Sequence, residues 1–91
     1  MTVTITMPAA GTTVGAMFNA KIVVGAPDTK VSSCDVNGRP ADSITPLMPG
    51  GNTFSAAFSN VPSSMNNLVP LMARGNGGGT DTINIKVAGS P

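Results

Sequence analysis

The feature that most constrains the fold of this 91-residue chain is a repeated alternation of apolar and polar residues, interrupted by glycine and proline. A period of two places every second side chain on one face of a β-strand, whereas a helix needs a period near 3.6 residues. No part of the sequence shows the helical period. The alternation predicts strands over residues 3–7, 18–26, 31–36, 53–59, 69–74 and 82–87.

Turn-forming residues separate these segments. Pro27–Asp28–Thr29 ends the second predicted strand, and Asn37–Gly38 tolerates the positive φ of a tight hairpin. The glycine-rich runs at 49–52 and 75–79 predict two more reversals. Two prolines restrict residues 39–47 to an edge strand, because proline has no N–H to donate to a ladder. Short strands at this spacing predict an all-β sandwich without helices.

Core and turn positions recur at regular spacing along nearly the whole chain: Ile5, Pro8, Gly11, Val14, Val31, Cys34, Val36, Asn37, Gly38, Phe54, Asn67, Val69, Leu71, Ala73, Gly77, Ile83, Ile85 and Val87. This pattern resembles the bacterial immunoglobulin-like modules of surface proteins, polysaccharide-degrading enzymes and phage virion proteins. The resemblance implies an immunoglobulin-like antiparallel β-sandwich of about seven short strands, as one domain over residues 1–91. It implies an inward, core position for Cys34. Pro70 departs from the pattern because it lies inside what should be a central strand, and a bulge there would reconcile the two.

The small net charge of +1 excludes two classes of partner. Nucleic-acid binding and membrane binding both use clustered basic residues, and here the basic residues are scattered along the chain. The longest apolar stretch, 22–26, is far shorter than a transmembrane helix. We therefore expect neither nucleic-acid binding nor membrane insertion. The dispersed basic residues are Lys21, Lys30, Arg39, Arg74 and Lys86.

The side-chain inventory argues against catalysis. The chain has no histidine and no glutamate, so a nucleophile would lack the usual base, and clustered ligands for transition metals are missing. We expect no enzyme activity and no cofactor. Sugar binding is disfavoured, because sugars stack on exposed aromatic rings and the only aromatic residues, Phe18, Phe54 and Phe58, are expected to face the core.

In an immunoglobulin-like topology the second-to-third and sixth-to-seventh strand loops meet at one end, which would bring Asp28 near Asp81. A weak calcium site there is the alternative to two ordinary turn residues. Loops carry recognition on such scaffolds, so the same end is the candidate partner-binding site. Its residues are Asp28, Thr29, Lys30, Asn52, Arg74, Asn76, Thr80 and Asp81.

Methionine is unusually frequent, and this flexible side chain suits either a thin core or an adaptable contact surface. We assign Met7, Met17 and Met72 to the core. Met48 and Met65 lie near predicted loops, where a contact surface is the alternative.

Two functions fit these features. The first is a non-catalytic interaction module at the surface of a phage virion, bound to the protein surface of a capsid, tail or fibre. A starting methionine without a signal peptide favours it. The second is a spacer or adhesion module of a secreted bacterial multidomain protein, located outside the cell or on its surface. Self-association is compatible with both.

Overall fold

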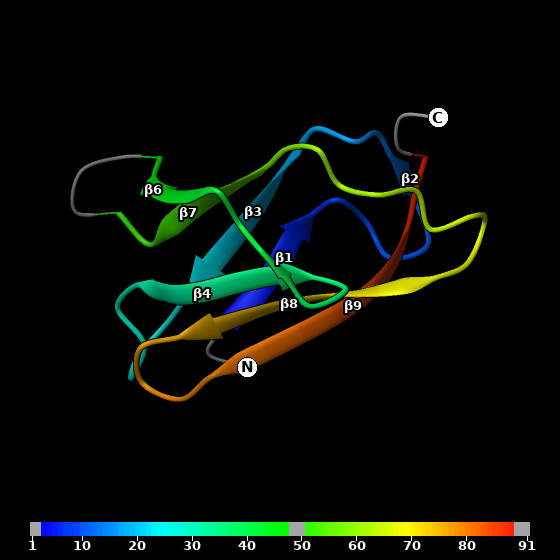
Figure 1. Ribbon diagram of the computed structural model, residues 1–91. Helices are drawn as coiled ribbons and strands as arrows, with labels where there is room; N and C mark the ends of the chain where they lie inside the picture. The colour runs from blue at the N-terminus through cyan, green and yellow to red at the C-terminus, as the bar shows by residue number, and fades with distance from the viewer. Residues whose placement is uncertain (1–2, 48–50, 89–91) are drawn as a thin grey trace.

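The computed structural model describes residues 3–47 and 51–88, which form two facing β-sheets (Figure 1). Within these residues there are nine strands and no helix, so the expected all-β fold is confirmed. Seven strands have four or more residues, and two have only two. The strands are β1 Val3–Met7, β2 Thr13–Val14, β3 Phe18–Val24, β4 Val31–Val36, β5 Arg39–Pro40, β6 Ser43–Pro46, β7 Thr53–Phe58, β8 Val69–Gly75 and β9 Thr80–Val87.

The strand order is that of an immunoglobulin-like sandwich. One sheet runs β1-β3-β7-β6, and the other runs β2-β9-β8-β4-β5. Neighbouring strands are antiparallel, with the exception of the β2–β9 pair, which is parallel and pairs Val14 with Val87. The expected antiparallel sandwich is therefore confirmed, with one short parallel pair added at its edge. As predicted, residues 39–47 supply edge strands: β5 borders one sheet and β6 borders the other.

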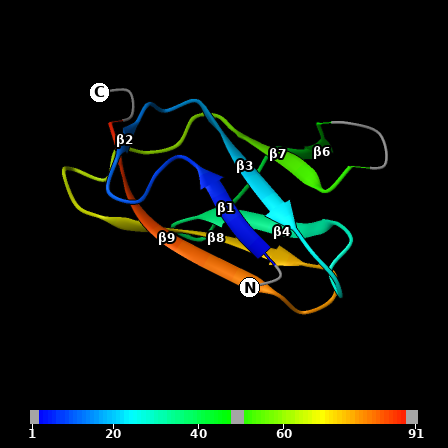
Figure 2. The same cartoon turned by 180° about the vertical axis from the view of Figure 1, so that it is seen from behind.

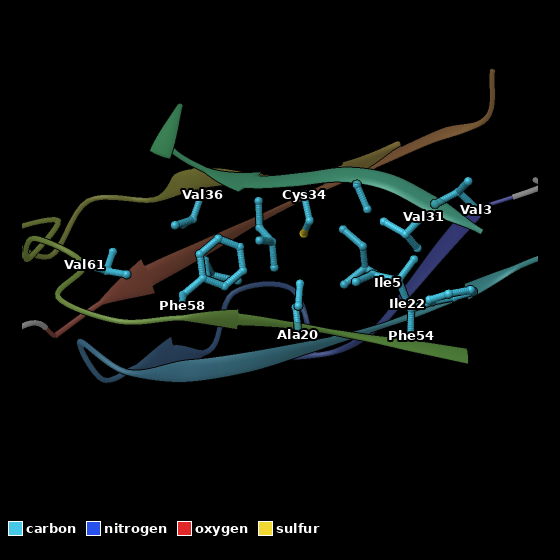
Figure 3. Close-up of a cluster of buried hydrophobic side chains, with 14 of the residues drawn as sticks. Val3, Ile5, Ala20, Ile22, Val31, Cys34, Val36, Phe54, Phe58 and Val61 are labelled. Carbon is cyan, nitrogen blue, oxygen red and sulfur yellow. The ribbon is translucent and has the colours of Figure 1, made fainter. Parts of the chain in front are cut away.

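The core lies between the sheets, where alternating strand residues meet (Figure 3). Strand β7 shows the alternation clearly, since Phe54, Ala56 and Phe58 are buried and the residues between them are half-buried. The ring of Phe58 stacks on that of Phe18 with 4.9 Å between the ring centroids. Such offset stacks add stability beyond the apolar area they bury.

The methionines among the described residues do not belong to this core, contrary to our expectation. Met7 is 50% exposed because the β1–β3 register shifts between Ile5 and Met7, which turns the end of the strand outward. Met17 is 77% exposed, and Met72 is only half-buried. The inner face is instead built from β-branched, small and aromatic side chains, which suit a pleated surface.

Pro70 lies in regular pairing, so the expected bulge was wrong. It stands opposite Asn84 in an uninterrupted β8–β9 register, and its carbonyl accepts the Asn37 N–H at 2.7 Å. Asn37 stands opposite Pro70 just beyond the end of β4, so the missing N–H of Pro70 removes only a bond at the end of the β4–β8 ladder. The irregularity in the β4–β8 pair lies between Val31 and Ser33 instead.

Cys34 occupies the expected inward position. Its side chain is 2% exposed, and Figure 3 shows its sulfur pointing between the sheets. Burial, with a smaller contribution from the negative charge of Asp35, raises the pKa of the thiol to about 12. The thiol acts here as a small apolar group.

A thiol-reactive dye should label Cys34 slowly in the native protein and rapidly in denaturant. The thiolate is the reactive species, and the raised pKa and burial keep the native thiol protonated and covered. Intact mass against time measures both rates. Equal rates in the two conditions would contradict the assignment of Cys34 to the core.

Phe58→Ala should lower the free energy of unfolding by about 3–5 kcal/mol, since it removes a buried ring and leaves a cavity. Urea denaturation measures the change. Met17→Ala is the matched control: its side chain is 77% exposed, so its unfolding midpoint should stay close to that of the unchanged protein. Similar losses in the two variants would argue against the described core.

Candidate functional site

Three loops lie at one end of the sandwich, on the left in Figure 1. The β3–β4 loop spans 25–30, the β8–β9 loop spans 76–79, and residues 51–52 lead into β7. Backbone bonds join them: the Val24 N–H donates to the Asn52 carbonyl at 2.9 Å, and the Asn76 N–H donates to the Lys30 carbonyl at 3.0 Å. The structure therefore gathers the loops as the topology predicted.

The centre of this end is the carboxylate of Asp28, which is 3% exposed. Its Oδ1 accepts the Gly77 N–H at 2.6 Å and the Gly79 N–H at 3.3 Å. A buried carboxylate is stable only where such donors replace its water. Asp28 is thus a structural link between two loops, and its side chain is not part of the exposed contact surface that the sequence suggested.

The fit around Asp28 requires glycine in the opposite loop. A Cβ on Gly75 would lie 2.3 Å from Asp28 Oδ1, and a Cβ on Gly77 would lie 2.8 Å from the Pro27 carbonyl oxygen. Both distances are far inside van der Waals contact. Glycine is therefore needed at both positions because the two loops lie so close together. The sequence indicated only that this glycine-rich run forms a hairpin turn.

Asn76 makes a second link between the same loops. Its Oδ1 accepts the Thr29 N–H at 2.8 Å and the Lys30 N–H at 3.2 Å. Its Nδ2 donates to Thr29 Oγ1 at 2.9 Å. The side-chain amide of Asn76 is therefore hydrogen-bonded to both the backbone N–H and the hydroxyl of Thr29. Both residues nevertheless remain exposed to solvent.

The remaining predicted residues divide into two groups. Lys30, Asn52, Arg74 and Thr80 are exposed at the loop end, where two cationic side chains lie among polar neighbours. Asp81 is half-buried, and its Oδ2 accepts the N–H of Ile5 in β1 at 2.8 Å. The role of the exposed group in binding a partner stays a prediction.

The geometry does not support the calcium alternative. The carboxylates of Asp28 and Asp81 accept backbone N–H groups from different elements, whereas calcium needs several oxygens that converge on one point. Across residues 3–47 and 51–88, no group of three or more His, Cys, Asp or Glu side chains is placed to hold a metal ion.

A second surface feature, which sequence reasoning missed, lies at the opposite end. It is a shallow pocket of about 130 Å³ beside the β7–β8 connection. Ser64 fixes that connection to β9: its N–H donates to the Val87 carbonyl at 2.9 Å, and its Oγ accepts the Val87 N–H at 2.9 Å. The next residue, Met65, has a φ of 53° and is 83% exposed. The pocket is lined by Val36, Asn37, Arg39, Val61, Pro62, Ser63, Ser64, Val69 and Val87.

No sequence pattern pointed to this pocket, although Met65, for which a contact surface was the alternative, directly follows the lining residue Ser64. Its walls come from four separate segments, so no local pattern could reveal it. Met48, the other methionine read in this way, lies outside the described residues.

Comparison with known proteins supports the fold and shows that a similar fold occurs as one part of a longer protein. No protein-family model matches the sequence, and no curated protein matches it. Among solved structures, the chain is similar to part of the endo-β-1,4-mannanase from Thermotoga petrophila, with a TM-score of 0.74 and 16% sequence identity. The match covers 98% of this chain and 20% of the mannanase chain. The chain thus has the fold of a small β module within a much longer protein.

The described residues contain no helix that is long and apolar enough to cross a membrane.

Gly75→Ala should destabilise the protein by about 1–3 kcal/mol, the range typical of an overpacked interior, because the new methyl group would collide with Asp28. Thermal and urea unfolding measure the loss. Gly25→Ala is the matched control at the same end, since a Cβ there meets nothing within 4 Å. Equal stabilities for the two variants would contradict the close approach of the loops.

Proposed function

We propose that this chain acts as a non-catalytic spacer or adhesion module within a longer secreted protein of the polysaccharide-degrading or cell-surface class. The observation that carries the proposal is the structural match to one fifth of a mannanase chain. That match favours the multidomain function over the virion module, which no comparison supports. The proposed location is outside the cell or on its surface, and the proposed partner is a neighbouring protein surface.

The path of the chain suits a module in a series. β1 begins at the loop end, where Val3 pairs with Val24, and β9 ends at the other end, where Val87 pairs with Val14 (Figure 2). The long axis of the sandwich is 39 Å, against 22 and 18 Å across it. Neighbouring domains attached before β1 and after β9 would therefore be joined toward opposite ends of the sandwich.

The side chains support a role without catalysis. Asp28 and Asp81 are engaged by backbone N–H groups, and Asp42 accepts a hydrogen bond from the Ser59 hydroxyl. The aromatic rings of Phe54 and Phe58 are buried, so they offer no platform for a sugar. These features favour protein contact or spacing over hydrolysis or carbohydrate binding.

Sedimentation of the isolated chain at micromolar concentration tests this function. A spacer or adhesion module folds by itself, so we expect a folded monomer with cooperative thermal unfolding. A stable trimer, or a chain that folds only with an assembly, would contradict the proposal and favour the virion alternative.

A pull-down with insoluble mannan and cellulose complements this measurement. We expect the chain to stay in the supernatant, because two of its three rings are buried and the third, on half-buried Phe18, is stacked on Phe58. Specific retention, abolished by soluble oligosaccharide, would replace the spacer function with carbohydrate binding.

A further inference from the structure

Two Asn–Gly dipeptides occur in the chain, Asn37–Gly38 and Asn76–Gly77. In such a pair the glycine nitrogen can attack the side-chain amide carbon of asparagine, because glycine has no Cβ to obstruct the approach. The attack needs a side chain that can rotate and a glycine nitrogen that is not held elsewhere. The structure gives the two pairs opposite conditions.

Asn76–Gly77 is restrained on both sides of the required bond. The amide of Asn76 takes part in three hydrogen bonds to Thr29 and Lys30, at 2.8, 3.2 and 2.9 Å. The Gly77 N–H donates to the buried carboxylate of Asp28 at 2.6 Å. Attack at this pair would break the links that hold the two loops together.

Asn37–Gly38 lies at the exposed tip between β4 and β5. No side-chain hydrogen bond joins Asn37 to another described residue, and a Cβ placed on Gly38 would meet nothing within 4 Å. The hairpin is short, because β5 has only two residues and one further backbone bond, from the Ala41 N–H to the Cys34 carbonyl at 2.9 Å, extends its pairing. At the tip itself, the Asn37 N–H is held by one bond to the Pro70 carbonyl. Local opening of such a tip costs little free energy.

We propose that Asn37 is a site of spontaneous deamidation and that the loop contacts protect Asn76. In this reaction the Gly38 nitrogen bonds to Asn37 Cγ, the Cγ–Nδ2 bond breaks, and ammonia leaves with the proton that the nitrogen loses. Water then opens the five-membered imide at either carbonyl, which gives aspartate or isoaspartate. No other reactant is required.

The modification changes the pocket end of the molecule. Each event replaces a neutral amide with a carboxylate, so the formal net charge falls from +1 to zero. Asn37 and Arg39 both line the pocket, so the new negative charge would stand on the same rim as the guanidinium. Isoaspartate also adds one atom to the backbone of the turn, which disturbs the pairing of Val36 with Arg39.

The test is incubation of the full chain in mildly alkaline buffer, natively and in denaturant, with deamidation at each asparagine followed by peptide mass spectrometry. In the native protein we expect the rate at Asn37 to exceed that at Asn76 by about tenfold or more. In denaturant the two rates should become similar, because both sites share the Asn–Gly sequence. A native ratio near one, faster reaction at Asn76, or a stable Asn37 would overturn the proposal.

Two variants sharpen the result. Asn37→Gln should remove the first acidic species that forms in native samples on ion-exchange chromatography, and persistence of that species would count against Asn37 as its source. Thr29→Ala removes the partner of Asn76 Nδ2, so it should speed reaction at Asn76 and leave Asn37 unchanged. An unchanged rate at Asn76 in this variant would refute protection by the loop contact.

Discussion

The loop end of this sandwich depends on one buried carboxylate. Asp28 accepts an N–H from Gly77, which lies 49 positions later in the chain, and so joins the β3–β4 loop to the β8–β9 hairpin. Removing a carboxylate from water is costly unless donors are in place, so the two loops must close together. The β4–β8 pairing begins beside this link, where Val31 stands opposite Gly75, and Asn76 adds further bonds across the same gap.

The sequence predicted those elements that carry their own signal. The alternation over 53–58 and 82–87 follows from the pleat of a strand, and Asn37–Gly38 forms the hairpin that its tolerance of positive φ suggests. The role of Asp28 could not be predicted in this way. Locally it is a turn residue after Pro27, and its function becomes visible only when a distant glycine-rich loop lies against it.

The failures of prediction also have tertiary causes. Met7 continues the alternation of β1, but a register shift against β3 turns it outward. β2 has only two residues, too few for a pattern, and exists because β9 offers it a parallel edge. The pocket near Val61 is assembled from separate segments. Core and turn positions record how a chain folds and say little about what it binds, so the function had to be inferred from comparison and from surface geometry.

The hydrogen bond from Ile5 to Asp81 has a consequence for the behaviour of the protein in crowded solution. β1 is the outermost strand of its sheet, and outermost strands offer unpaired backbone groups on which another chain can add a strand. By accepting the Ile5 N–H at 2.8 Å, the carboxylate occupies a donor in the middle of that edge and sets a negative charge beside it. An incoming strand would have to displace the carboxylate, so this bond opposes the addition of a strand at the middle of the β1 edge.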